Sequence, residues 1–326
     1  MAAALADRPS PRTVELQSID LESLAPVLAE QIASWKTELD WDFTTSANLV
    51  RRFVQMRALA GYALVSLARP GQVVGYSYYV CEDSKGLIGD LYVLKQHRSA
   101  ESETALFQST LDAMWQTPGV TRIESQLLML MDSANRRVPY PNWFQSFPRL
   151  FLEAPLAVLP RRNLSPTIAI VPWTEGYQEA TGRLIANTYK DHIDSQINDQ
   201  YRSPTGARRF LTNIVQYPGC GAFFAPASFA AGDRGTLCGA SLASLVSRDV
   251  GHITQVCVAP SYQGTGLGYE LMRRSMEALA ARGCRSVSLT VTAENEPAVR
   301  LYRKMGFVEK RRFSAYVWEP GAIMVK

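Results

Sequence analysis

The chain has 326 residues, of which 47% are hydrophobic and 20% charged, and its formal net charge is +4. These values describe a globular protein with room for two hydrophobic cores. The charge is too small, and basic residues too scattered, for us to expect a nucleic-acid partner. No apolar run reaches the roughly 18 residues that cross a bilayer, so we expect no membrane segment.

The first residues and the cysteines indicate the cellular compartment of the protein. Residues 1–12 lack the basic and apolar regions of a signal peptide, and we expect a flexible tail there. The five cysteines are scattered and form no Cys-x-x-Cys pair. This pattern favours reduced thiols over disulfides or a metal site, and it predicts a cytoplasmic protein without a metal.

Hydrophobic periodicity divides the chain into two similar series of elements. The first series predicts strands at residues 13–20, 62–68, 73–81, 86–94 and 120–131 and helices at 21–37, 47–57 and 101–116. A proline-containing stretch at residues 159–166 reads as a linker. The same order then begins again, with strands at 167–171, 221–230 and 236–246 and helices at 177–189 and 205–215.

The repeated order predicts an α/β protein with two domains, residues 13–158 and 167–326, each a central mixed β-sheet flanked by helices. An offset of 165 residues places Asp90-Leu-Tyr-Val-Leu94 on Gln255-Val-Cys-Val-Ala259. The alternative is that two α/β domains share this order by chance.

The strongest local pattern is a glycine-rich loop between a strand and a helix. The β-branched run 253–258 is followed by Gln263, Gly264, Gly266 and Gly268, and then by residues with helical periodicity. Closely spaced glycines let backbone N–H groups point into one cavity, and the helix N-terminus adds unpaired donors. This arrangement predicts a pyrophosphate site, although glycines with this spacing also occur in ordinary turns.

The spacing of the loop separates it from two other phosphate-binding motifs. No Gly-Lys-Ser/Thr follows the glycines, which argues against a P-loop nucleoside triphosphatase. A dinucleotide-binding fold requires Gly-x-Gly-x-x-Gly, whereas this loop has Gly-x-Gly-x-Gly.

Two motifs in this order resemble those of the GNAT acetyltransferase superfamily. Gln-x-x-Gly-x-Gly after a strand ending in Val-Ala-Pro resembles the acyl-CoA-binding motif of that family. Asn295-x-x-Ala298-x-x-x-Tyr302-x-x-x-Gly306-Phe307 resembles its downstream signature. The resemblance implies two tandem GNAT-like domains, with acetyl-CoA as the cosubstrate of an N-acetyltransferase in residues 167–326.

The first copy differs from the second at the positions that would bind phosphate. At the offset of 165 residues, Ser99, Glu101 and Glu103 take the places of the three glycines. Side chains would fill such a cavity, and carboxylates would repel a pyrophosphate. We therefore expect residues 13–158 to be a degenerate copy that does not bind CoA.

The resemblance also implies a set of cofactor-binding residues in the second copy. The backbone carbonyls of Val256 and Val258 would pair with the pantetheine amides, and Asn295 and Tyr302 would contact the same arm. The pyrophosphate would be held by the loop residues Gln263, Gly264, Thr265, Gly266, Leu267 and Gly268.

Two side chains are candidates for proton transfer. Tyr302 matches the tyrosine that protonates the departing CoA thiolate in the family; the alternative is an aromatic residue of the core. His252 matches a position where some relatives carry a catalytic glutamate. An imidazole suits a general base near neutral pH, although a histidine at a strand end is often only a hydrogen-bonded surface group.

The acceptor is expected to be the amine of a small molecule or peptide. Asp191, Asp194 and Asp199, with nearby tyrosines, would hold a cationic amine, or else they belong to a solvated loop. Two alternatives remain: a non-catalytic protein that senses acyl-CoA or binds a partner, and an acyltransferase with another acyl group or acceptor. The repeat predicts either a monomer with a pseudo-dimeric structure or a homodimer.

Overall fold

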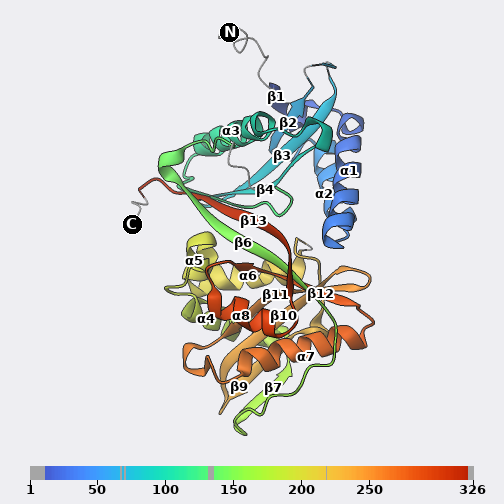
Figure 1. Cartoon of the computed structure of the whole chain (residues 1–326). Helices are drawn as coiled ribbons and strands as arrows, with labels where there is room; N and C mark the ends of the chain where they lie inside the picture. The colour runs from blue at the N-terminus through green and yellow to red at the C-terminus, as the bar shows by residue number, and fades with distance from the viewer. Residues whose placement is uncertain (1–11, 67, 70, 131–135, 218, 322–326) are drawn as a thin grey trace, which may run out of the picture. The chain divides into compact units, whose positions relative to one another are not determined.

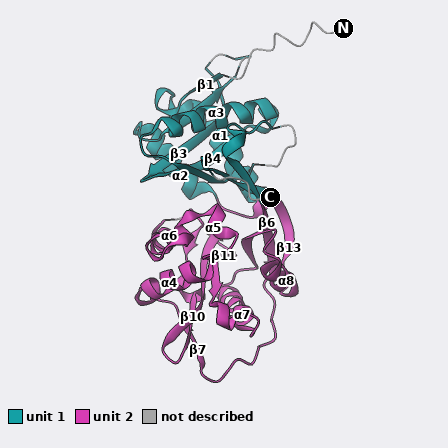
Figure 2. Cartoon of the chain, turned by 90° about the vertical axis from the view of Figure 1, so that its left-hand side faces the viewer, with its two compact units in different colours: residues 1–37, 43–147, 313–326 teal, residues 38–42, 148–312 magenta. Residues whose placement is uncertain are grey.

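Figure 1 shows a computed structural model of the chain, which describes residues 12–66, 68–69, 71–130, 136–217 and 219–321. The predicted tail therefore lies outside the described residues, apart from Arg12. The chain divides into two compact units, which Figure 2 draws in teal and magenta. Unit 1 contains residues 1–37, 43–147 and 313–326, and unit 2 contains residues 38–42 and 148–312.

Unit 1 is a mixed β-sheet with helices on both of its faces. The strand order is β1-β2-β3-β4-β5-β13. Figure 1 shows α1 and α2 on one side of this sheet and α3 on the other. The bounds are β1 Arg12–Glu15, α1 Leu21–Leu39, α2 Thr44–Gln55, β2 Gly61–Val65, β3 Val73–Glu82, β4 Lys85–Val93, α3 Ala100–Gln116, β5 Arg122–Gln126 and β13 Val308–Trp318.

Unit 2 repeats this plan with the strand order β6-β12-β11-β10-β9-β7, and β8 pairs with β10. The strands are β6 Phe144–Pro155, β7 Ile168–Pro172, β8 Ala222–Phe223, β9 Phe229–Asp233, β10 Thr236–Ser247, β11 Val250–Val258 and β12 Ser286–Thr292. The α-helices are α4 Gln178–Thr188, α5 Asp194–Ile197, α6 Pro204–Gln216, α7 Leu267–Ala281 and α8 Glu296–Lys304. Short 3-10 turns are η1 Leu16–Ser18, η2 Lys95–His97, η3 Pro141–Trp143, η4 Glu175–Tyr177, η5 Asp199–Arg202, η6 Ala225–Ala227 and η7 Pro260–Tyr262.

The helix that follows the glycine-rich loop is fixed by an apolar face and a glycine at each end. Leu267, Leu271 and Leu279 recur at helical spacing along α7, and all three side chains are fully buried. Gly266 precedes the helix with φ 90°, and Gly283 follows it with φ 95°, a conformation that favours glycine. The first turn of α7 is therefore held firmly in place.

Most predicted helices and strands are confirmed, and four predicted strands are too long. The strand expected at 13–20 ends at Glu15, the one expected at 62–68 ends at Val65, and the one expected at 120–131 ends at Gln126. The strand expected at 221–230 is interrupted by the turn η6, because Pro226 lacks the N–H group that a strand ladder requires. The two predicted α/β domains of mixed sheet and helices are confirmed as the architecture.

Two long strands, β6 and β13, each belong partly to both units. β6 pairs antiparallel with β12 over residues 149–155, and β13 pairs antiparallel with β5 over residues 315–318. The sheet of unit 1 thus contains the last strand of the chain. The predicted domain bounds 13–158 and 167–326 do not allow for strands that are shared between the two units, and these bounds remain a proposal.

The structure also bears on membrane association. Among the residues that it describes, every helix is too short or too polar to span a bilayer.

Candidate active site

Unit 2 contains a cavity of about 1150 Å³ at the end of β11. Its wall is formed by that strand, the glycine-rich loop, α8, the turn after α4 and the segment before β7. The lining residues are Arg161, Arg162, Asn163, Thr188, Tyr189, Asp191, His192, Ile193, Val256, Cys257, Val258, Tyr262, Gln263, Gly264, Thr265, Gly266, Gly268, Tyr269, Glu294, Asn295, Pro297, Ala298, Leu301, Tyr302 and Lys304. Ten of the predicted site residues therefore meet in one cavity: Asp191, Val256, Val258, Gln263, Gly264, Thr265, Gly266, Gly268, Asn295 and Tyr302.

The glycine-rich loop leaves the first turn of α7 uncovered by side chains. Gly264 and Gly266 have φ values of 77° and 90°, which L-residues adopt only with strain. Gly266 is the N-cap residue, and it provides no side-chain hydrogen bond to the helix. The N–H groups of this turn are therefore available to an anion, which the helix dipole also favours.

The other predicted loop residues contribute in different ways. Gly268 lies inside α7, where an added Cβ would stand 3.5 Å from Cγ2 of Val258, which is ordinary van der Waals contact, so packing alone does not require a glycine there. Leu267 is fully buried, and only its backbone can serve the loop. The hydroxyl of Thr265 donates a 2.7 Å hydrogen bond to the Tyr262 carbonyl, which fixes the loop itself.

The central strands of unit 2 separate beside the cavity. β11 and β12 pair in parallel from Val250 to Ile253 only, and the rest of β11 has no partner in β12. The hydroxyl of Tyr189 donates to the Val256 carbonyl at 3.1 Å, and the amide of Gln263 donates to the Val258 carbonyl at 3.3 Å. Both predicted carbonyls thus border the cavity. The Val256 carbonyl also accepts a 3.4 Å hydrogen bond from the Gln255 amide, whereas the Val258 carbonyl keeps a second lone pair for a ligand amide.

Tyr302 projects from α8 into a buried part of the cavity wall. Its ring packs 5.8 Å from that of Phe307, centroid to centroid, and its side chain is 6% exposed. Burial raises the pKa of the Tyr302 hydroxyl; the Asp194 carboxylate raises it further, and the Arg149 guanidinium partly opposes this. The hydroxyl therefore keeps its proton at neutral pH and can donate it.

Asn295 caps the helix that carries Tyr302. Its side-chain oxygen accepts a 3.3 Å hydrogen bond from the N–H of Ala298, and Pro297 occupies the first turn. The same residue lines the cavity. The predicted cap is confirmed, and the predicted contact of Asn295 with a ligand stays a prediction.

The structure does not bring His252 to the cavity. Its ring is 4% exposed and lies between Trp41, at 5.1 Å between centroids, and Phe151, at 6.3 Å. Nδ1 forms a 2.8 Å hydrogen bond with the Ser288 hydroxyl, and burial lowers the pKa of His252 to about 3. A neutral, enclosed imidazole cannot take a proton from a substrate, so we do not retain His252 as the base.

Replacing His252 by glutamine is expected to leave turnover near the parental value. The substitution should also make the free energy of unfolding less dependent on pH in the acid range. Unfolded histidine binds a proton below pH about 6.5, whereas folded His252 does so only near pH 3. The parent therefore loses about 1.4 kcal/mol of unfolding free energy per pH unit as the pH falls through this window, and the variant lacks that contribution.

Denaturant titrations of the parent and His252→Gln at pH 7.5 and pH 4.5 measure the difference. Equal acid sensitivity of the two proteins would show that the ring is not buried in the neutral form. A loss of turnover of about a hundredfold would instead return His252 to the mechanism.

Comparison with known proteins identifies the family of this region. Residues 192–307 match the model of the acetyltransferase (GNAT) family. The chain therefore contains a GNAT domain. The matched segment includes the glycine-rich loop, β12 and the helix of Tyr302, which are the elements that carry the two sequence motifs.

Curated relatives of the GNAT domain match over short segments. The chain is 35% identical over 69 residues to the uncharacterized N-acetyltransferase MJ1207 of Methanocaldococcus jannaschii, covering 21% of this chain and 30% of the relative. It is 48% identical over 58 residues to the mycothiol acetyltransferase of Thermobifida fusca, covering 18% of each protein. The matches thus span a third or less of these relatives' lengths.

Solved structures share the fold over nearly the whole chain. The GCN5-related N-acetyltransferase from Sphaerobacter thermophilus has a TM-score of 0.68 at 20% identity, covering 96% of this chain and 98% of that one. A tandem GNAT protein from the clavulanic acid biosynthesis pathway has a TM-score of 0.62 at 15% identity, covering 96% and 100%. The tandem GNAT fold therefore includes unit 1 as well as the GNAT domain.

The predicted acceptor carboxylates of the GNAT domain are not brought together. Asp191 lines the cavity, whereas Asp199 begins the turn η5 and is absent from the lining. Asp194 accepts hydrogen bonds from Thr292 and from Arg149, the latter at 3.2 Å. Because Asp194 is already paired with a cation, it does not serve as an open site for an amine.

His192 is a cavity residue that the sequence did not single out. Its Nδ1 accepts a 3.1 Å hydrogen bond from the N–H of Asp194, and its ring meets Tyr189 edge-on at 5.2 Å. The same Nδ1 lies 3.4 Å from Oδ2 of Asp194. His192 therefore adds an imidazole to the cavity wall beside Asp191.

The N-terminus of α3 in unit 1 is capped by side chains, unlike that of α7. Ser99 and Ser102 form a capping box that uses N–H groups of the first turn of α3. Glu103 is buried against Arg136, with Nη2 of the arginine 2.7 Å from its carboxylate. Both features agree with the prediction of a degenerate first copy.

Among the described residues, His, Cys, Asp and Glu side chains do not gather in groups of three or more that could hold a metal ion.

Proposed function

We propose that the protein is an N-acetyltransferase whose GNAT domain transfers the acetyl group of acetyl-CoA to a primary amine. The observation that carries this proposal is that one cavity is lined both by the open N-terminus of α7 and by Tyr302. The loop at residues 263–268 would hold the pyrophosphate, and the separated end of β11 would pair with the pantetheine arm. This arrangement would place the thioester at the far end of the cavity, near Tyr302.

The reaction is a direct attack. The free amine attacks the thioester carbon, the C–S bond breaks, and the electron pair leaves on the CoA sulfur. Tyr302 donates its hydroxyl proton to that sulfur, and the proton that the acylated nitrogen then releases restores the hydroxyl. The amine must have lost a proton beforehand, and we propose that water takes it, because His252 is enclosed in the core.

Release of free thiol from acetyl-CoA tests this function. The full chain is incubated with acetyl-CoA and a panel of small-molecule and peptide amines, and thiol formation is corrected for hydrolysis. Amine-dependent release supports the proposal. Tight acetyl-CoA binding without release for any amine would favour the alternative, a non-catalytic acyl-CoA sensor.

Replacing Tyr302 by phenylalanine is expected to lower turnover by about a hundredfold or more, the usual contribution of a general acid. The dissociation constant of acetyl-CoA should change little, since the buried ring remains. Steady-state rates and calorimetric binding measure the two effects. Tyr217→Phe, at a side chain that is 62% exposed, is the control, and turnover equal to that of the control would remove Tyr302 from the mechanism.

A narrower acceptor is supported by the curated relatives. Six of them are mycothiol acetyltransferases, which are 37–48% identical over 57–61 residues. An amine precursor of a small thiol is therefore our second candidate for the acceptor. Inclusion of such an amine in the panel decides between this candidate and other amines.

A further inference from the structure

The segment between β6 and β7 forms a strap along the first turns of α7, which we define as residues 159–164. Leu159 packs against the core of α7 and β12, and Leu164 packs against Leu267 and Leu271. Between these anchors, the Pro160 carbonyl accepts a 2.9 Å hydrogen bond from the Tyr269 hydroxyl. The strap is therefore attached to the helix that carries the glycine-rich loop.

The strap directs two arginines at this loop. Arg161 and Arg162 line the same cavity as Gly264 and Gly266. The guanidinium of Arg162 lies 5.3 Å from the ring centroid of Tyr269. A Cβ added to Gly266 would stand 3.9 Å from Cβ of Arg162. The stem of Arg162 thus borders the open end of α7.

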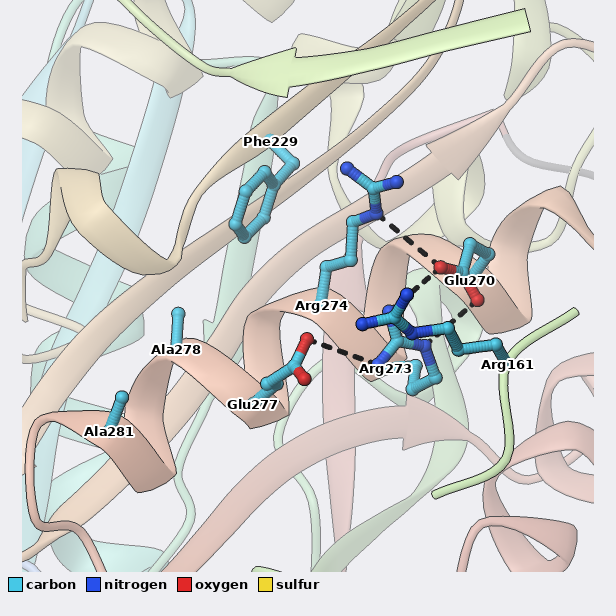
Figure 3. A pocket seen from close by; sticks show the side chains of 8 residues that line it. All are labelled: Arg161, Phe229, Glu270, Arg273, Arg274, Glu277, Ala278 and Ala281. Atoms are coloured by element: carbon cyan, nitrogen blue, oxygen red, sulfur yellow. Dashed lines mark hydrogen bonds and ion pairs between the residues drawn. The ribbon is translucent and has the colours of Figure 1, made fainter. Parts of the chain in front are cut away.

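Two arginines of α7 are paired with a carboxylate, whereas Arg161 and Arg162 are not paired with any carboxylate among the residues that the structure describes. Arg161 also lines a smaller hollow of about 440 Å³, shown in Figure 3, together with Arg273 and Arg274. In that hollow Arg273 pairs with Glu270 at 2.8 Å, and Arg274 pairs with the same carboxylate at 3.4 Å. Within the part of the chain that the structure describes, neither Arg161 nor Arg162 forms an ion pair.

The positive charges of Arg161 and Arg162 match a second phosphate group of CoA. CoA carries a 3′-phosphate monoester besides its pyrophosphate, and a monoester has about two negative charges at neutral pH. The unpaired N–H groups of the first turn of α7 would be used by the pyrophosphate, and the 3′-phosphate would need further donors. Guanidinium groups bind phosphate oxygens in pairs and are the usual partners of such a monoester.

We propose that Arg161 and Arg162 form a subsite for the 3′-phosphate of CoA and that the strap makes the enzyme selective for 3′-phosphorylated cofactor. This inference rests on the proposed function, because it takes CoA as the ligand of the cavity. It assigns a binding role to a stretch that joins the two halves of the chain.

Calorimetric binding of CoA and of dephospho-CoA to the full chain tests the subsite. The parent is expected to prefer CoA by about tenfold or more, as for a charge-assisted phosphate contact. In the variant Arg161→Gln/Arg162→Gln the preference should fall towards one, because CoA binding weakens while dephospho-CoA binding is retained. Arg282→Gln, an exposed arginine at the other end of α7, should keep the parental preference.

Trypsin provides a second readout that does not depend on these variants. The strap offers cleavage sites at Arg161 and Arg162, and CoA should slow cleavage there more than dephospho-CoA does. A double variant that keeps the parental preference, or equal weakening of both ligands, would overturn the subsite. If the parent binds neither ligand, the proposed cofactor itself is wrong.

Discussion

The variant Gly266→Glu is expected to lose acetyl-CoA binding while unit 2 stays folded. Gly266 has φ 90°, so any L-residue there is strained by roughly 1–2 kcal/mol. The larger effect is chemical, because the new carboxylate would stand where the pyrophosphate must approach the N–H groups of α7. Calorimetric titration with acetyl-CoA measures the binding, and circular dichroism checks the fold.

Gly283→Glu is the matched control at the other end of the same helix. Gly283 has φ 95°, and no atom lies within 4 Å of the position of an added Cβ. The control carries the same strain and the same charge, and it should bind acetyl-CoA like the parent. Equal loss of binding in both variants would trace the effect to a weakened helix, and unaltered binding in Gly266→Glu would refute the phosphate cradle.

The sequence predicted the glycine-rich loop correctly because its determinants are local. A β-branched strand, left-handed glycines and an amphipathic helix follow one another within thirty residues, and each one limits the conformation of the next. The proposal of a degenerate first copy rests on the same kind of reasoning, because Ser99 and Glu103 take the places of glycines at the offset of 165 residues. Both predictions depend on backbone conformation rather than on distant contacts.

The failures come from contacts between residues far apart in the chain. His252 looked like an accessible base because the sequence does not show that Trp41, from the segment after α1, covers its ring. Asp194 looked like an acceptor site because its partner Arg149 lies in β6, a strand that the pattern did not predict. The strap at residues 159–164 read as a linker, although its two arginines were the available signal of a binding role.

Replacing Trp318 by alanine is expected to destabilise unit 1 by about 3–5 kcal/mol, the usual cost of removing a buried aromatic side chain. Trp318 is fully buried; its Nε1 donates to the Pro139 carbonyl at 2.8 Å, and its ring packs 6.0 Å from Phe107 of α3. Hydrogen exchange should therefore accelerate in α3 and β5, about 200 residues earlier in the sequence.

The variant Trp318→Ala also shows whether the end of β13 belongs to the predicted C-terminal domain or to unit 1. With the proposed bounds, Trp318 belongs to the domain 167–326, and its loss should damage the acetyl-CoA site. If the end of β13 instead belongs to unit 1, as in the structure, the acetyl-CoA site should survive, because every residue that lines the cavity lies in unit 2. Val308→Ala, in the same strand but 60% exposed, should change neither exchange nor binding. Loss of acetyl-CoA binding in Trp318→Ala, with α3 still protected, would show that the last strand stabilises the C-terminal half instead.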